Sequence, residues 1–380
     1  MFVFKAFKSR FNIETTAVRC QSFYPERPVV PRPSVFSLDS PACAKALLAR
    51  YTETCHRWRT ALVPISLLVL LAVVFPVSAC AGPADTLQLE LERAVWLESR
   101  GALNLSGLTL GGDGYLYFTD DNGPAAIDWQ PQNPVLLRIR VDSVVDRAIE
   151  YPCLEALEVE GDMAFAQIAE SGGKAHKFDF EGVAAAGGGK LWVVDERDRL
   201  LLEYDPASRA LKKIAGYREL AAWHERLSRG GINNGFEGIA LTGRWLFLAH
   251  EMYPNLIVRY GLGKDGGMAA EKVIEIAGSS DITGLESSDG ALYALGRTGS
   301  MVYKIDPESG EVVSAATFRR EGDDSRYRYR QRMEHYRNSE GLAVGGGRIF
   351  IVLDGNFQSS LVNDNQRQPL LLIYRRPEGF

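Results

Sequence analysis

Cysteine is scarce in the chain: five are present among 380 residues, and only Cys80 and Cys153 lie at or beyond residue 80. A disulfide framework therefore does not hold the main domain together. Zinc-type Cys/His spacing is absent as well, so no zinc site is indicated. The chain also lacks an excess of basic residues, since its formal charge is -5. Neither a nucleic acid nor an anionic membrane surface is therefore expected as a partner.

The first eighty residues differ from the rest. Residues 1–60 are irregular, contain Pro and Arg, and precede the apolar stretch "ALVPISLLVLLAVVFPVSAC" at 61–80. The basic flank "HRWRT" and the small-residue end are typical of a secretory signal. An uncleaved transmembrane anchor is the alternative. Both the signal and the anchor would place the rest of the chain outside the cytoplasm and tether it to a membrane. Because about fifty residues precede the signal and no Met lies between Met1 and Met163, we expect translation to start downstream at a non-Met codon.

The segment "VSAC", ending at Cys80, resembles the lipobox of bacterial lipoproteins. This resemblance implies cleavage before Cys80 and lipidation of its thiol. The sequence therefore predicts a lipoprotein of the periplasm or cell envelope, with its folded domain at 88–376.

A Gly between an oxygen-bearing and an aliphatic side chain occurs five times. The copies are Ser106-Gly107-Leu108, Glu181-Gly182-Val183, Glu237-Gly238-Ile239, Thr283-Gly284-Leu285 and Glu340-Gly341-Leu342. Strand-forming residues recur nine and eleven positions after each Gly, and a charged residue recurs thirteen positions after it. Agreement at several offsets identifies a structural repeat.

The repeat predicts an all-β fold, a five-bladed β-propeller. Separations of 75, 56, 46 and 57 residues between the glycines suit blades of four short strands, and continuous helical periodicity is absent from the repeating segments. The 75-residue interval leaves a sixth blade as the alternative, with "MAFAQIA" as its candidate strand. Glycine beside each acidic residue would let the backbones approach near the axis.

The first strand of a propeller blade lines the central channel, and the second strand runs antiparallel to it. The residues one before and thirteen after each Gly should therefore surround one mouth of the channel. The inner ring comprises Ser106, Glu181, Glu237, Thr283 and Glu340, and the outer ring comprises Asp120, Asp195, Glu251, Arg297 and Asp354. Facing carboxylates repel one another unless a cation or protons neutralise them.

Oxygen ligands at flexible spacing suit Ca²⁺. Calcium is accordingly the predicted cofactor. The candidate ligands are Glu181, Glu237, Glu340, Asp120, Asp195 and Glu251. Caps of turns, or a solvated ring without an ion, are the alternatives.

Two further side chains at the mouth are candidates for binding a ligand. Arg297 interrupts the outer ring and would either pair with a neighbouring acid or hold an anionic ligand group. His250 would suit a general base, although a hydrogen-bonded loop histidine is the alternative. The segment "FRREGDDSRYRYRQRMEHYR" adds an Arg/Tyr-rich insert, which would either grip anions or form a solvated helix paired with its own acids.

The segments "NLSGLTL", "VVDER", "NNGFEGIA" and "NSEGLAV" resemble the blades of the SdiA-regulated domain family. This resemblance, over residues ~100 to 376, implies a five-bladed propeller with a calcium site and no established activity. The succession of Glu-Gly blades is also similar to the esterase-like phytase propellers, which implies phosphoester hydrolysis at a calcium-bound, carboxylate-rich face.

The sequence thus leaves two functions open, beside a purely structural role in which the ion only stabilises the fold. The first is a lipid-anchored, calcium-binding module of the envelope for a small anionic ligand or an envelope protein. The second is a calcium-dependent phosphoester or lactone hydrolase that uses the same carboxylates.

Overall fold

The computed structural model describes residues 86–98, 103–121, 136–159, 179–196, 199–216, 220, 235–250, 256–263, 267–277, 279, 281–330, 338–355 and 358–380. All of them belong to one compact unit, Ser78–Phe380. The predicted signal with Cys80, the candidate sixth-blade strand and Glu251 lie outside these ranges. Within them, no helix combines the length and the hydrophobicity that crossing a bilayer requires.

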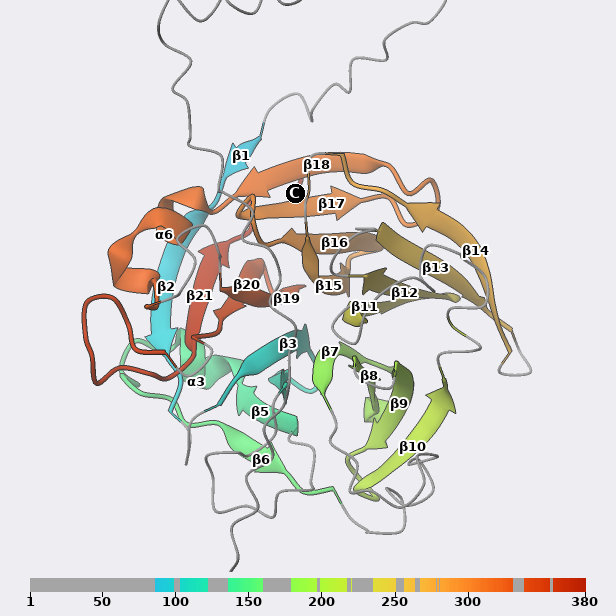
Figure 1. Ribbon diagram of the computed structural model, residues 1–380, viewed down its shortest axis with the longest axis horizontal. Helices are drawn as coiled ribbons and strands as arrows, with labels where there is room; N and C mark the ends of the chain where they lie inside the picture. Colours follow the sequence, from blue (N-terminus) through green and yellow to red (C-terminus); the bar gives the residue numbers. More distant parts are fainter. Residues whose placement is uncertain are drawn as a thin grey trace, which may run out of the picture. The chain divides into compact units, whose positions relative to one another are not determined.

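In the described residues, five sheets surround a central axis, each built on four antiparallel strands, as the prediction of a five-bladed propeller requires (Figure 1). Blade 1 holds β3 (Leu105–Leu110), β4 (Tyr115–Asp120), β5 (Leu136–Arg140) and β6 (Glu155–Leu157); blade 2 holds β7 (Phe180–Ala185), β8 (Leu191–Asp195), β9 (Leu200–Asp205) and β10 (Ala210–Ala215). Blade 3 holds β11 (Phe236–Thr242), β12 (Trp245–His250), β13 (Leu256–Leu262) and β14 (Met268–Ile274). Blade 4 holds β15 (Ile282–Ser288), β16 (Ala291–Gly296), β17 (Met301–Ile305) and β18 (Val312–Thr317).

Blade 5 combines the two ends of the propeller. It holds β19 (Ser339–Gly345), β20 (Arg348–Leu353), β21 (Leu370–Arg375) and the early strand β2 (Glu90–Trp96). Because β2 supplies the outermost strand beside β21, the chain closes its own ring and the edge of β21 is covered. The short β1 (Leu87–Gln88) adds a parallel strand to β18 of blade 4.

The innermost strands touch in the order β3, β7, β11, β15, β19 and back to β3. These contacts close the ring with five blades, so the six-bladed alternative is wrong. The five repeat glycines stand where neighbouring inner strands meet. A Cβ on Gly107 would lie 2.5 Å from the carbonyl oxygen of Glu181, and one on Gly341 would lie 2.6 Å from that of Ser106. Only glycine allows this approach, which confirms the prediction of crowded backbones near the axis.

Apolar layers between adjacent blades form the core. Between blades 5 and 1, for example, Val352 and Leu371 pack in one cluster with Leu108 and Phe118. A strand that packs against an adjacent blade on each of its two faces is buried on both faces. This explains near-continuous apolar runs such as "LLLIY" in β21. Short helices lie between strands: α3 (Val141–Val145), η1 (Gly187–Gly189), α6 (Arg319–Asp323) and η3 (Ser325–Tyr327).

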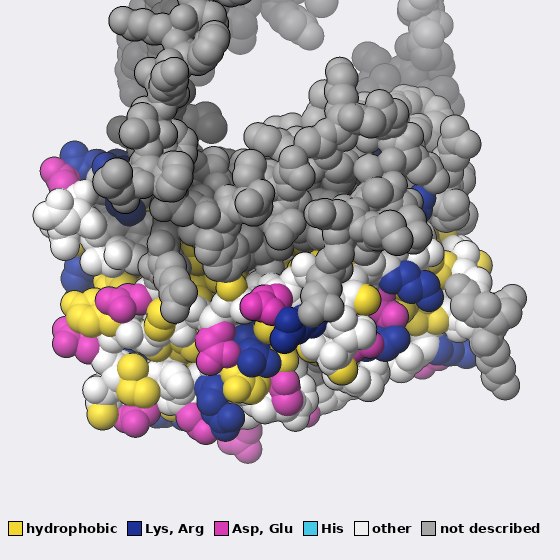
Figure 2. Space-filling view, turned by 90° about the horizontal axis from the view of Figure 1, so that it is seen from below, with side chains coloured by type: hydrophobic (Ala, Val, Ile, Leu, Met, Phe, Trp, Pro, Cys, Tyr) yellow, Lys and Arg dark blue, Asp and Glu magenta, His cyan; other side chains and the backbone are white. Residues whose placement is uncertain are grey.

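Charge is finely mixed on the rim of the propeller. In the side view of Figure 2, the described basic side chains (dark blue) and acidic side chains (magenta) alternate, with hydrophobic ones between them. Interspersed charges of both signs largely cancel at a distance. Local clusters therefore matter more for ligand binding at this rim than the overall charge does.

Candidate functional site

The second residue of every inner strand lies at one mouth of the channel. These residues are Ser106, Glu181, Glu237, Thr283 and Glu340, and all five are buried. In each blade the pairing of the first two strands shifts register at this position, which marks a β-bulge. A bulge releases one residue from the ladder and redirects its side chain. The repeated bulge thus explains how five polar side chains come to line the mouth instead of packing between blades.

Carboxylates gather most closely at blade 2. Asp179, Glu181 and Glu196 each offer an oxygen, and these atoms lie within 4.8 Å of one another. Asp179 immediately precedes β7, Glu181 is its second residue, and Glu196 follows β8. Ser106 of blade 1 donates a hydrogen bond to Glu181, and the backbone N–H of Gly235 donates to Glu196 at 3.0 Å. Groups from blades 1 and 3 therefore hold the acids of blade 2 in place.

Burial and like charge disfavour ionisation in this cluster. Burial raises the pKa of the Glu181 carboxyl well above its ordinary value, and Glu237 and Asp121 raise it further, while the Ser106 hydrogen bond opposes them. The pKa of Asp121 is raised to about 8, mainly by burial and also by Asp179, Asp120 and Glu340. The mouth of blades 1 to 3 is thus a place where positive charge would be strongly stabilised.

The donor set fits a hard divalent cation. Two oxygens bound to one Ca²⁺ at 2.3–2.6 Å lie at most about 5 Å apart, and the three carboxylates of blade 2 meet this condition. All three are oxygen donors, which suit Ca²⁺ or Mg²⁺ better than softer metals. A possible acidic metal site therefore exists, with blade 2 at its centre.

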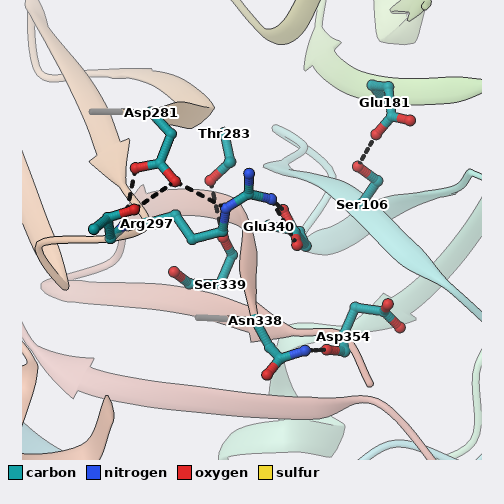
Figure 3. A network of polar contacts seen from close by, with 10 residues as sticks. Ser106, Glu181, Asp281, Thr283, Arg297, Asn338, Ser339, Glu340 and Asp354 are labelled. Carbon is teal, nitrogen blue, oxygen red and sulfur yellow. Dashed lines mark hydrogen bonds and ion pairs between the residues drawn. The ribbon is translucent and has the colours of Figure 1, made fainter. Parts of the chain in front are cut away.

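The opposite side of the mouth already contains a cation. Arg297 is buried and directly follows β16. It donates from Nη1 to both oxygens of Glu340 at 3.0 and 2.9 Å and from Nε to Asp281 at 3.1 Å (Figure 3). Thr298 also donates to Asp281, through its N–H at 2.9 Å and its hydroxyl at 2.8 Å. Of the two alternatives for Arg297, the structure shows pairing with neighbouring acids. The carboxylate of Glu340, a predicted metal ligand, is thus hydrogen-bonded to the guanidinium of Arg297.

The outer-ring acids hold the starts of inner strands. Asp120 accepts a hydrogen bond from the backbone N–H of Asn104 at 2.7 Å, and Asp195 accepts one from that of Asp179 at 2.8 Å. Both carboxylates are buried, and burial raises the pKa of Asp120 to about 7. Asn338 donates a side-chain hydrogen bond to the backbone carbonyl of Asp354 (Figure 3). The capping role that the sequence left open is thus present at Asp120 and Asp195.

Other predicted groups lie nearby or outside the described ranges. His250 ends β12 and is buried with its ring edge-on to Phe236, at a centroid distance of 6.4 Å. The first half of the Arg/Tyr-rich insert forms α6 and η3, where Arg326 pairs with Asp324 at 2.6 Å. Pairing with its own acids, one of the two alternatives, is therefore seen in this half. Glu251 and Cys80 are not among the described residues.

Sequence reasoning missed Asp121, Asp179 and Glu196. A signal for each was present. Asp179 stands three residues before the repeat Gly of its blade, and Asp121 and Glu196 each stand fourteen residues after the repeat Gly of theirs. The first of these positions holds Asn or Asp in four of the five blades: Asn104, Asp179, Asp281 and Asn338. Comparing the five blades at these two positions, three before and fourteen after the Gly, would have identified the carboxylate cluster of blade 2.

The chain is similar to several solved structures at low sequence identity. No curated protein matches the chain. A solved glutaminyl cyclase from Myxococcus xanthus is similar at 16% identity and a TM-score of 0.46, covering 77% of this chain and 98% of its own. A virginiamycin B lyase from Staphylococcus aureus is similar at 12% identity and a TM-score of 0.34, covering 76% and 74%.

A family model matches far more of the chain than any single motif does. It is described as "Phytase-like: Esterase-like activity of phytase" and matches residues 101–365, well over half of the chain and nearly all of the propeller. Of the two families that the sequence resembles, this is the second, and membership of the SdiA-regulated family stays an expectation. The chain belongs to the phytase-like family.

Proposed function

We propose that this propeller binds Ca²⁺ at the blade 2 side of its channel mouth and hydrolyses phosphate esters there. The observation that carries the proposal is the carboxylate cluster of Asp179, Glu181 and Glu196, in a chain of the phytase-like family. A bound calcium ion would neutralise these acids and polarise a phosphoryl oxygen. The activity in the family description makes phosphate esters the first substrates to test.

The chain's own residues prepare this site before any ligand arrives. The hydroxyl of Ser106 orients Glu181, and the N–H of Gly235 orients Glu196. Asp195 fixes the backbone N–H of Asp179 and thereby the residue that precedes β7. Carboxylates that are held in this way lose little conformational freedom when they bind an ion, so the entropic cost of binding is small.

A calcium-binding module without catalysis is the second candidate. The observation in its favour is that Arg297, which could otherwise grip a substrate phosphate, already contacts Asp281 and Glu340. The ion would then stabilise the ring and shape a surface for a small anion or an envelope protein.

Calcium titration of the purified protein separates these proposals from a site without an ion. Binding to the folded state alone stabilises it by about 2.7 kcal/mol when free Ca²⁺ is a hundred times the dissociation constant. Glu181→Gln should remove most of this gain. Glu203→Gln is the matched control, because Glu203 lies in the same blade but pairs with Lys190 at 2.7 Å. An equal calcium shift in wild type and Glu181→Gln would refute the assigned site.

Hydrolysis is tested with p-nitrophenyl phosphate and a panel of phosphate esters and lactones, with and without calcium. Calcium-dependent turnover that Glu181→Gln abolishes and Glu203→Gln retains would establish the enzyme. Calcium binding without turnover would instead favour the binding module.

We also propose that the mature chain is anchored outside the cytoplasm by lipid on Cys80. The support comes from the sequence, where "VSAC" follows a signal-like apolar stretch. Labelled palmitate should be incorporated into the wild-type chain and not into Cys80→Ser. Incorporation into both would exclude Cys80 as the anchor.

A further inference from the structure

A pocket of about 280 Å³ lies at the opposite end of blade 5 from the carboxylate mouth. Its charged lining residues are Glu90, Glu92, Arg93, Arg147, Arg348 and Arg375. β20 runs from Arg348 at this pocket to Leu353 near the mouth, five residue steps or about 17 Å. The pocket is therefore separate from the site proposed for calcium.

The lining of the pocket is strongly basic. It contains four guanidinium groups and two carboxylates, which leaves a net charge of +2. The charges come from three parts of the fold: the turn after α3, the start of β20 with the end of β21, and the start of β2. Guanidinium groups that converge from several directions attract anions with more than one acceptor oxygen.

One carboxylate orients two of these guanidiniums. Glu92 accepts from Nε of Arg348 at 2.8 Å, and its other oxygen lies 3.4 Å from Nε of Arg375. The hydrogen bond from Arg348 lowers the pKa of Glu92, although burial opposes this effect. Arg375 also donates from Nη1 to Glu90 at 3.0 Å. Arg348 and Arg375 are thus each held in position by only some of their N–H donors.

Arg93 contributes charge to the pocket, but its N–H donors are directed at backbone carbonyl oxygens and not at a ligand. Its guanidinium donates to the carbonyl oxygens of Val144, Asp146 and Ile149, which close the turn after α3. This turn places Val145 and Arg147 at the pocket. Arg93 is therefore a positioning residue.

Many donors of the other three arginines remain available within the part of the chain that the structure describes. A guanidinium has five N–H groups. Arg348 uses one in the contact with Glu92, Arg375 uses two in its contacts with Glu90 and Glu92, and Arg147 uses one towards the carbonyl oxygen of Glu92. A phosphate group has three or more acceptor oxygens in a tetrahedral arrangement, whereas a carboxylate has two in a plane. Donors on three sides therefore match phosphate better.

We propose that the pocket formed by Arg147, Arg348 and Arg375 binds a phosphate group, carried either by a small soluble phosphate or by a phospholipid headgroup. The volume is just below the range of pockets for drug-sized ligands, which suits a small phosphate-bearing group. This site does not depend on the proposed hydrolase activity.

Orthophosphate is the first probe, titrated calorimetrically into the full chain in chloride buffer after dialysis against metal-free buffer. No chelator is present, because polycarboxylate chelators would compete for the same arginines. We expect saturable binding in the millimolar range or tighter. Arg348→Gln and Arg375→Gln should each weaken it about tenfold or more, since a charge-assisted hydrogen bond is lost.

The matched control is Arg138→Gln. Arg138 contacts Glu155 through Nε at 3.0 Å with 32% of its side chain exposed, and Arg348 contacts Glu92 through Nε at 2.8 Å with 33% exposed. The control removes the same charge and the same kind of ion pair, so its phosphate affinity should stay within about twofold of wild type.

A second arm identifies the source of the phosphate. Sedimentation with vesicles that contain phosphatidic acid, whose headgroup is a phosphomonoester with three terminal oxygens, is compared with phosphatidylcholine vesicles. Binding to the former should depend on Arg348 and Arg375 but not on Arg138 if a headgroup is the ligand. A third measurement needs no variant: phosphate or the bound vesicle should protect Arg348 and Arg375 of the wild type from phenylglyoxal, as read by mass spectrometry. Absence of binding in both arms, equal binding by all variants, or equal modification with and without ligand would each overturn the proposal.

Discussion

Glu286 provides a direct test of the geometry of the channel. It lies on β15 of blade 4, yet one of its carboxylate oxygens accepts from the Thr109 hydroxyl at 3.0 Å and from the Leu110 N–H at 3.1 Å, both on β3 of blade 1. Its other oxygen accepts from the Ser287 N–H at 2.9 Å. Blades 4 and 1 are not neighbours in the ring, and β15 and β3 face each other across its centre in Figure 1. The carboxylate thus links two blades through the channel.

Burial raises the pKa of Glu286 from an ordinary 4.5 to about 8, against the hydrogen bonds from Leu110, Ser287 and Thr109, which lower it. The folded state therefore holds this proton more tightly than the unfolded chain does. The contribution of Glu286 to stability is complete below pH 4.5 and is lost as the pH rises towards about 8. Each pKa unit corresponds to about 1.4 kcal/mol, so the full loss is at most about 5 kcal/mol.

The assay is urea unfolding of wild type and Glu286→Gln at pH values between 4.5 and 9. The amide that replaces the carboxyl group in this variant does not titrate, so subtracting the two curves cancels every other group that titrates. We expect the free energy of unfolding of the wild type to fall relative to the variant by several kcal/mol between pH 5 and 8, as the linkage relation requires. Parallel curves over this range would show that Glu286 is not a buried, titrating link across the channel.

Two further predictions concern the mouth and the axis. Arg297→Ala should lower the free energy of unfolding by about 3–5 kcal/mol, because it leaves two buried carboxylates without their guanidinium; urea titration checks this, and a loss below about 1 kcal/mol would contradict it. Gly107→Ala should cost at least about 1–3 kcal/mol by overpacking against the next inner strand, whereas Gly112→Ala, where an added Cβ would meet nothing within 4 Å, should cost far less. Equal melting temperatures of the two variants would contradict the close approach at the axis.

The fold was predictable because repetition multiplies weak signals. Each Gly of the repeat is ambiguous alone, but glycine, aliphatic and strand-forming residues recur at fixed offsets in all five copies. The strand β2 was not predictable in the same way. It carries no repeat glycine, and its place beside β21 depends on a contact between the two ends of the chain. No local pattern encodes such a long-range pairing.

The mouth was predictable as a place but not as a set of contacts. The offset rule correctly brought Glu181, Thr283 and Glu340 to one end of the inner strands. It could not show the bulge that turns these side chains inward, nor that Arg297 would contact Glu340. Both depend on tertiary geometry over distances of a few ångströms, which repeat spacing does not define.

The distribution of acids among equivalent positions explains why blade 2 is the candidate metal centre. Three rows of the repeat reach the mouth, at three before, one before and fourteen after the Gly. Blade 2 alone has acids in all three, and the rows read Asn104, Ser106, Asp121; Asp179, Glu181, Glu196; Gly235, Glu237, Met252; Asp281, Thr283, Thr298; and Asn338, Glu340, Gly355. Residue 252 of blade 3 lies outside the described ranges; in the other four blades all three rows are described, and one of these blades supplies three carboxylates within 4.8 Å.

This asymmetry also determines where an ion would lie. If the ring acids acted together, Ca²⁺ would lie on the channel axis between Glu181, Glu237 and Glu340, as the inner-ring geometry suggested. In the structure, Arg297 neutralises the side of the mouth at blades 4 and 5, and a cation near it would be repelled. The same ion gains most beside Glu181, where buried carboxylates raise one another's pKa. A calcium-soaked crystal should consequently show the ion displaced from the axis towards blade 2, and density on the axis against Glu340 would refute this placement.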